Sequence, residues 1–181
     1  TKYEAGALHI LYGSADGASG VGSHWYYQNS PDWPGRAETG DRFASSLAIG
    51  DIDNDGVGDL LVGIPGEKMG QYEDAGQVQI RYNPGDWSQT EIRVQTLYQN
   101  LRGVKNRVES GDRFGEFIQV VDLIEDDSLD VIIGIPGESI SKKLNAGAVA
   151  ILRGLNGEIS TGNDQILYPY QSSISGNSQA Q

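Results

Sequence analysis

The chain has 181 residues, no cysteine and a formal net charge of −12 at pH 7. It therefore forms no disulfide and offers no thiol chemistry, and its charge disfavours binding to the phosphate backbone of a nucleic acid. Its 25 glycines, and the lack of a long apolar helical pattern, favour an all-β protein rich in turns. The longest apolar run, residues 131–136, is far too short to span a membrane.

The first two strand candidates lie at about residues 6–12 and 22–28. In the second of them, the alternation of a strand puts Trp25 and Tyr27 on one face and Tyr26 on the other. We expect Trp25 and Tyr27 to pack between neighbouring layers of the fold. The alternative is that these rings lie exposed beside polar groups and hold a sugar.

An acidic segment, Asp51–Asp59, separates two further strand candidates at about residues 44–50 and 59–64. Glycine at its sixth position lets the chain reverse, and oxygen-bearing side chains stand at its first, third, fifth and ninth positions. Ca²⁺ takes roughly six to eight oxygen ligands in a flexible geometry. We therefore predict a Ca²⁺ site whose ligands are the side chains of Asp51, Asp53, Asp55 and Asp59 and the carbonyl oxygen of Val57.

The residues after this loop exclude an EF-hand. That motif needs a glutamate at loop position twelve and a helix on each side, but position twelve is Val62, and Pro65 would break a following helix. A solvated turn is the alternative, because Asp and Gly are common in turns that bind nothing. The expected ligand set leaves no open position beside a general base, so we expect the ion to have a structural role.

The sequence repeats itself at an offset of 71 residues. Gly40–Phe43 matches Gly111–Phe114, and Gly63–Glu67 matches Gly134–Glu138. Four short antiparallel strands form one blade of a β-propeller. Each repeat contains four strand candidates, which in the first repeat lie at about residues 44–50, 59–64, 76–82 and 92–99.

We therefore expect three units in an all-β propeller fold. Residues 1–39 would hold the outer strands of a preceding blade and a linker, residues 40–110 the first repeat, and residues 111–181 the second. These units supply about two and a half blades, whereas a closed propeller needs roughly four to eight. We expect the other blades of a propeller with about six to eight blades to come from a longer parent chain or from self-association.

The second repeat carries an altered copy of the acidic loop. Asp122, Asp126 and Asp130 keep the first, fifth and ninth positions. Ile124 replaces the ligand at the third position, and Asp127 replaces the glycine at the sixth, although Asp adopts positive φ more readily than most residues. The three retained aspartates are therefore weaker candidates for metal ligands.

These features resemble the FG-GAP repeat, the blade unit of integrin α-subunit propellers and of many bacterial secreted proteins. The Phe-Gly pair of that family matches Phe114–Gly115 and is altered to Phe43–Ala44, and its Gly-x-Pro triplet matches residues 63–65 and 134–136. The family also carries a calcium loop like the one at residues 51–59. The chain looks most similar to the bacterial integrin-like type.

The resemblance implies a Ca²⁺-binding, non-enzymatic propeller segment that is secreted or lies at the cell surface. Its role would be binding or adhesion, and its ligand on the extracellular side would be a protein or a carbohydrate. One alternative is a substrate-recognition propeller of a secreted hydrolase or polysaccharide lyase. Another is a structural spacer that has no ligand of its own, since propellers host many unrelated functions.

Two histidines and two tryptophans are the remaining candidates for site residues. His9 and His24 lie on strand candidates without recognisable partners of a catalytic triad, so we expect half-buried packing roles and no catalytic residue. Trp33 and Trp87 fall in expected loops. They are the better candidates for a contact at the surface.

Two pairs of charged residues stand at equivalent positions of the repeats. Arg42 and Arg113 are expected to pair with nearby carboxylates or carbonyls and to hold the blade geometry. Glu67 and Glu138 end the Gly-Ile-Pro-Gly-Glu segments. They are expected to contact the neighbouring blade.

Overall fold

Within the residues that the structure describes, all regular secondary structure is β-strand, which confirms the predicted all-β fold class. The computed structural model describes residues 2–31, 33–83, 85, 92–101, 104, 106–162 and 164–169. Across these residues no helix is both long and apolar enough to pass through a membrane.

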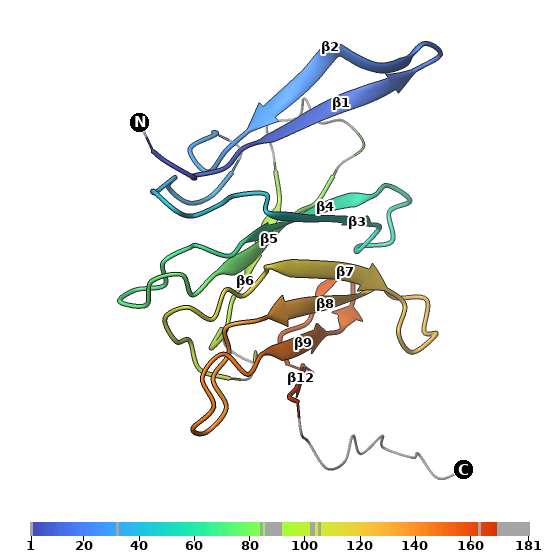
Figure 1. Ribbon diagram of the computed structural model, residues 1–181. Helices are drawn as coiled ribbons and strands as arrows, with labels where there is room; N and C mark the ends of the chain where they lie inside the picture. Colours follow the sequence, from blue (N-terminus) through green and yellow to red (C-terminus); the bar gives the residue numbers. More distant parts are fainter. Residues whose placement is uncertain are drawn as a thin grey trace, which may run out of the picture.

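Two four-stranded antiparallel sheets form the body of the molecule and lie one beside the other (Figure 1). We call them blade 1 and blade 2. Blade 1 contains β3 (Ser46–Gly50), β4 (Asp59–Ile64), β5 (Gln77–Arg81) and β6 (Val94–Leu97), in that order across the sheet. Blade 2 contains β7 (Phe117–Val121), β8 (Asp130–Ile135), β9 (Ala148–Leu152) and β12 (Gln165–Leu167), again in chain order.

Two hairpins accompany the blades. The N-terminal hairpin pairs β1 (Leu8–Ser14) with β2 (Gly17–Tyr26), so the two expected outer strands are present, and both extend into the segment expected to separate them. A second, small hairpin of β10 (Gly154–Leu155) and β11 (Glu158–Ile159) was not predicted. It lies between β9 and β12 in the chain, and we call residues 154–159 the blade 2 hairpin.

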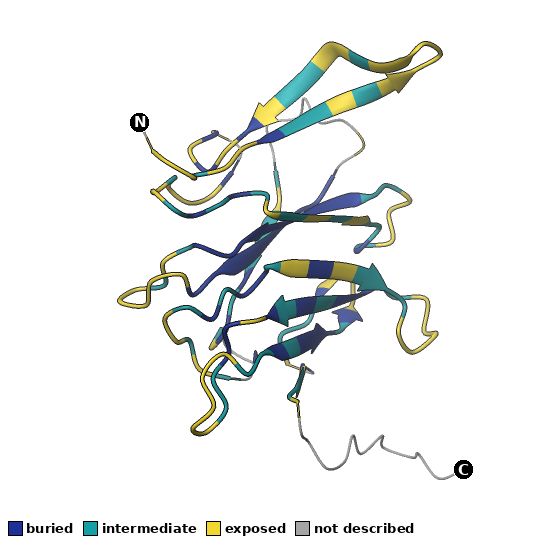
Figure 2. Cartoon of the chain, viewed as in Figure 1, coloured by how far each residue is buried: buried dark blue, intermediate teal, exposed yellow. Residues whose placement is uncertain are grey.

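Alternating side chains divide the core into two apolar clusters. Leu60, Val62 and Ile64 on one face of β4 pack in a cluster with Leu8 and Tyr26 of the N-terminal hairpin. The other cluster, which includes Leu61, joins blade 1 to blade 2. Because β4 is apolar on both faces, it reads as a continuous apolar run and is buried along its whole length (Figure 2).

Consecutive units are joined by backbone contacts that repeat along the chain. The Phe43 N–H donates to the Ala5 carbonyl at 2.9 Å, and the Phe114 N–H donates to the Ala75 carbonyl at 2.9 Å. Parallel bridges therefore form between Gly6 and Phe43 and between Gly76 and Phe114. Gly76 has φ of +84° and lies so close to Phe114 that a Cβ atom would collide with its backbone, which explains glycine at this position.

Side-chain hydrogen bonds cross the same junctions. Gln28 Nε2 donates to Glu67 Oε2 at 2.5 Å, and Gln99 Nε2 donates to Glu138 Oε2 at 2.9 Å. Both glutamines are buried, with 0% and 1% of their surface exposed. The expected contact of Glu67 and Glu138 with a neighbouring unit is confirmed.

The two repeated arginines both approach one carboxylate. Arg42 lies 3.6 Å from Glu116, and Arg113 lies 3.7 Å from the same side chain. Because Arg42 precedes β3 and Glu116 precedes β7, the first of these pairs links blade 1 to blade 2. The expected pairing of both arginines is confirmed.

The tryptophan at residue 33 is buried, so its expected role in a surface contact is wrong. Only 3% of Trp33 is exposed. Its ring centroid lies 5.6 Å from that of Tyr26 and 5.2 Å from that of Phe43, and its indole N–H donates to Gln79 Oε1. Loop position therefore did not imply exposure. Trp87 lies outside the described residues.

The faces expected for the aromatic run of β2 are also wrong. Tyr26 is buried, with the guanidinium of Arg81 5.3 Å from its ring centroid. Trp25 is 62% exposed, and its ring stacks on that of His9 with the ring centroids 4.0 Å apart. Tyr27 is 48% exposed. The side chains alternate between the two faces as predicted, but the face that carries Tyr26 is the one that packs against Arg81.

Candidate metal centre

The acidic loop connects β3 to β4 at one end of blade 1 (Figure 1). Asn54 and Gly56 have φ of +58° and +89°. Asparagine and glycine are the residues that adopt this left-handed conformation at the lowest cost. The sequence of the loop thus fits the tight path that folds its carboxylates together.

Three of the four predicted carboxylates converge. Oxygen atoms of Asp51, Asp53 and Asp59 all lie within 4.8 Å of one another. Asp59 is fully buried, and the other two are half-buried. Asp55 is exposed and stands outside this group, and its Oδ1 accepts the Val57 N–H at 2.7 Å. We call the three converging side chains the carboxylate cluster.

Backbone N–H groups orient two members of the cluster. Asp51 accepts bonds from Asp55 at 3.0 Å and from Gly56 at 2.9 Å. Asp59 accepts bonds from Ile52 and Asn83, both at 2.8 Å. A carboxylate has about four lone-pair sites, so each of these side chains keeps acceptor capacity for a cation. Ligating carboxylates in metal sites are commonly held by such outer hydrogen bonds.

The cluster carries an electrostatic cost that a cation would offset. Burial raises the pKa of Asp59, although the N–H groups of Asn83 and Ile52 oppose that shift. Asp53 Oδ1 is buried and has no hydrogen-bond partner among the described residues. An acceptor of this kind is costly unless something binds it. The donor set and its unmatched oxygen therefore fit a hard cation such as Ca²⁺.

Arg93 also reaches this site, which the sequence did not suggest. Its guanidinium lies 3.8 Å from Asp53 Oδ2. Asn83, whose N–H holds Asp59, was missed as well. Both residues lie more than 20 positions beyond the loop in the chain, so loop spacing alone contained no signal for them.

The altered loop of blade 2 keeps the same backbone scaffold. Glu125 and Asp127 have φ of +57° and +63°. Asp122 accepts N–H bonds from Asp126 and Asp127, each at 3.2 Å, and Asp130 accepts one from Gly154 at 3.0 Å.

The third ligand position is what this second loop lacks. Ile124 occupies it and is 46% exposed. In the part of the chain that the structure describes, the group at Asp51, Asp53 and Asp59 is the one set of three such side chains close enough to share an ion. The weaker candidates, Asp122, Asp126 and Asp130, are not brought together in that way.

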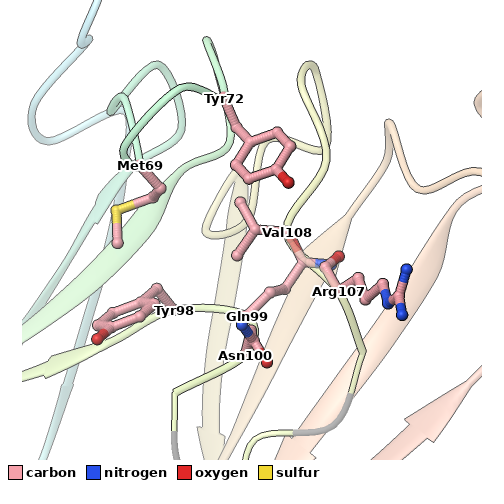
Figure 3. A pocket seen from close by; sticks show the side chains of 7 residues that line it. All are labelled: Met69, Tyr72, Tyr98, Gln99, Asn100, Arg107 and Val108. Atoms are coloured by element: carbon pink, nitrogen blue, oxygen red, sulfur yellow. The ribbon is translucent and has the colours of Figure 1, made fainter.

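A separate cavity of about 520 Å³ opens at the opposite end of blade 1 (Figure 3). The turn between β4 and β5 supplies Met69 and Tyr72, and the segment after β6 supplies Tyr98. Gln99, Asn100, Arg107 and Val108 complete its lining. The cavity therefore presents apolar and aromatic surface beside amide and guanidinium groups.

The sheets and their loops define a class of protein. Two four-stranded antiparallel sheets repeat along the chain, each with an acidic loop between its first two strands, and this is the arrangement of β-propeller blades. Residues 43–80 match the family described as the FG-GAP repeat. The predicted resemblance to the FG-GAP repeat is thus confirmed for residues 43–80, which include β3, β4 and most of β5 of blade 1. The bacterial integrin-like type stays a prediction.

The chain is also similar to a curated enzyme. The phosphatidylinositol-glycan-specific phospholipase D of Bos taurus is 28% identical over 113 residues. The match covers 62% of this chain and 13% of that enzyme. The chain thus spans only a small part of its relative's length.

Proposed function

We propose that the chain is a calcium-binding segment of an extracellular β-propeller with a binding or adhesion role. The observation that carries the proposal is the carboxylate cluster, which lies in an FG-GAP repeat and includes a buried, unpartnered oxygen of Asp53. Asp51, Asp53 and Asp59 would hold the ion, and water, Asp55 or the Val57 carbonyl would complete its shell. FG-GAP repeats are typical of extracellular proteins, where free Ca²⁺ is abundant.

The ion would stabilise the folded conformation of the loop. Carboxylates a few ångströms apart repel one another by roughly 1 to 4 kcal/mol per pair, depending on solvent exposure. A divalent cation bound between them would attract each carboxylate and so offset this repulsion. Extracellular modules bind Ca²⁺ with dissociation constants of about 10⁻⁴ to 10⁻³ M. We expect an affinity in this range. We also propose that this segment contributes no catalytic group.

A calcium titration followed by thermal melting tests the metal site. At 10 mM Ca²⁺ the expected affinity would add about 1.4 to 2.7 kcal/mol of stability, which raises the Tm by roughly 3 to 10 °C. Asp53→Asn should lose most of this rise. Asp122→Asn, at the first position of the altered loop, is the matched control and should keep it. A Tm that ignores Ca²⁺ in the parent chain would contradict the proposal.

The ligand of the binding role is proposed to be a protein or a carbohydrate. The cavity at Tyr72 and Tyr98 supports a small ligand such as a sugar ring, since its volume lies in the range of such sites and tyrosine offers both an apolar face and a hydroxyl. A glycan array on the parent chain and on Tyr98→Ala is the test. Binding that Tyr98→Ala leaves unchanged would place the ligand elsewhere.

A recognition module of a secreted hydrolase is the second candidate function. The match of 113 residues to a phospholipase D favours it. In that case the segment would bind the substrate, or a surface that carries it, and a separate domain would perform the reaction. Pull-down of glycolipid vesicles by the isolated chain would support this candidate, and the absence of vesicle binding would count against it.

A further inference from the structure

Arg93 stands between the carboxylate cluster of blade 1 and the blade 2 hairpin. Its Nη1 atom lies 3.8 Å from Asp53 Oδ2. Its Nη2 atom donates to the Gly157 carbonyl and to Glu158 Oε2, both at 3.1 Å. The guanidinium carbon lies 3.9 Å from the ring centroid of Tyr82, a cation–π geometry. One cation thus serves two carboxylates that belong to different blades.

The blade 2 hairpin is docked independently on the same part of blade 1. Gln95 Nε2 donates to the Ile159 carbonyl at 2.7 Å, and the Ile159 N–H donates back to Gln95 Oε1 at 3.2 Å. The Tyr82 hydroxyl donates to Gln95 Oε1 at 2.6 Å. A Cβ atom on Gly157 would lie 3.5 Å from Asp53 Cβ, so the hairpin turn touches the metal loop itself.

The second repeat lacks both members of the pair. At the offset of 71 residues, Ile124 takes the place of Asp53 and Asp164 takes the place of Arg93. The arginine thus occurs in the repeat that carries a carboxylate at the third loop position. It is absent from the repeat in which that carboxylate is absent. The arrangement therefore belongs to the metal loop and not to the blade scaffold.

We propose that Arg93 is an internal counter-ion of the carboxylate cluster that competes with a divalent cation for Asp53. A cation that enters the cluster would displace the guanidinium from Asp53, while the bonds to Glu158 and Gly157 retain it beside the blade 2 hairpin. Arg93 then lowers the affinity for Ca²⁺ and couples occupancy of the site to a contact between blades. This inference rests on the proposed metal site.

The expected size of the effect follows from the charge. A unit positive charge several ångströms from a divalent ion, near the surface and screened by salt, weakens ion binding by roughly threefold to tenfold. Arg93→Gln should therefore bind Ca²⁺ about threefold to tenfold more tightly than the parent chain. Arg93→Lys keeps the charge and should stay near the parent affinity. If Arg93 merely positioned Asp53, Arg93→Gln would instead bind more weakly.

The test is isothermal titration of the whole 181-residue chain with Ca²⁺, with far-ultraviolet circular dichroism to confirm that each variant is folded. Arg107→Gln is the matched control. It removes the same charge, but Arg107 lies at the cavity on the opposite end of blade 1 and forms no ion pair within the described part of the chain. Its dissociation constant should change by less than about twofold.

Glu158 offers a second variant that keeps Arg93 in place. In the parent chain Glu158→Gln leaves Asp53 as the carboxylate partner of Arg93, so Ca²⁺ binding should weaken. In the Arg93→Gln background the same change should have a clearly smaller effect. An equal effect in both backgrounds, or an Arg93→Gln affinity that is unchanged or weaker, would overturn the inference.

Failure of the proposed metal site gives a different pattern. If the parent chain shows no Ca²⁺ response but Arg93→Gln does, the site is closed by its counter-ion and the inference stands. If neither binds Ca²⁺ at concentrations up to about 10 mM, well above the range expected for such modules, both the metal site and the inference are wrong. If both bind with equal affinity, the metal site stands and the inference falls.

Discussion

Glu67 is a half-buried acid at the junction between the N-terminal hairpin and blade 1. Burial raises its pKa to about 7, and the charges of Asp41 and Glu38 act in the same direction, while the bond from Gln28 opposes them. An ionised Glu67 would thus share its surroundings with other negative groups. At neutral pH this carboxyl titrates in the folded protein.

The junction between the two blades repeats this arrangement. Burial raises the pKa of Asp112 to about 7, and the nearby charges of Glu138 and Glu109 add to the shift. Burial also raises the pKa of Glu138, against the hydrogen bond from Gln99. Each junction therefore favours a bound proton.

This makes stability depend on pH in a defined direction. The folded state holds the Glu67 proton up to about pH 7, whereas the unfolded chain releases it near 4.5. The free energy of unfolding should therefore fall as the pH rises from about 4.5 to 7, and acidification from about pH 8 to about pH 5 should raise the Tm. Melting in the presence of a chelator, which keeps the metal loop out of the result, measures this.

Two substitutions identify the groups responsible. Glu67→Gln and Glu138→Gln should each flatten the dependence of Tm on pH, because the neutral amide replaces a protonated carboxyl. Glu125→Gln, on the exposed loop of blade 2, should leave the slope unchanged. A parent protein whose Tm rises between about pH 5 and about pH 8 would contradict the predicted direction.

The tryptophans provide a second test at this scale. Trp33→Ala removes a buried ring and its bond to Gln79, so we expect a loss of about 3 to 5 kcal/mol in the free energy of unfolding. Trp25→Ala removes a ring that is 62% exposed, and it should cost less than about 1 kcal/mol. Urea unfolding of the two variants compares them directly. Similar losses would contradict the burial of Trp33 in solution.

At the scale of elements, the parallel bridge between Gly76 and Phe114 is a tightly constrained contact between the blades. Gly76 and Gly70 both have positive φ, but only Gly76 faces backbone atoms where a Cβ would stand. Gly76→Ala should therefore cost at least about 2 kcal/mol more than Gly70→Ala, because it adds a collision to the strain that both variants share. Equal denaturation midpoints for the two variants would contradict this.

The sequence predicted the elements better than their environments. The strands of both blades and the loop at Asp51 followed from local spacing and from the repeat, because period and turn chemistry are local properties. The face of Trp25 and the burial of Trp33 depend on what the N-terminal hairpin meets in blade 1. That contact joins residues far apart in the chain, so no pattern within one strand could decide it.

The candidate site shows the same division. Asp51, Asp53 and Asp59 converge as their spacing suggests, whereas Asp55 turns to the Val57 N–H. Arg93 stands 40 residues after Asp53, and the blade 2 hairpin arrives from another sheet. Such partners become visible only once the blades are packed together.

At the scale of the molecule, β3 and the N-terminal hairpin leave apolar side chains exposed. Leu47 and Ile49 of β3 are 48% and 73% exposed, and they line a groove of about 750 Å³ with Leu11 of the N-terminal hairpin. Figure 2 shows this exposed stretch of β3 beside the buried interior of blade 1. Contiguous apolar surface of this kind promotes association.

We therefore expect the isolated chain to self-associate as its concentration rises. Replacing Leu47 and Ile49 together by threonine gives both positions a β-branched residue, which strands favour, and should shift the protein toward the monomer mass of 19.5 kDa. Light scattering after size exclusion measures this mass. A parent chain that is already monomeric at about 100 µM would refute the expectation that its apolar surface drives association.

One part of each junction between units is a set of backbone hydrogen bonds that recurs along the chain. The carbonyls of residues 3–5 receive the N–H groups of residues 40–43 in the same way as residues 73–75 receive those of residues 111–114. These backbone bonds themselves require little of the side chains beyond a glycine on one side and a phenylalanine on the other. Gene duplication or exchange in steps of one repeat would preserve these bonds at every junction, so a propeller of this type can change its loops, and with them its ligands, while its blades continue to pack in the same way.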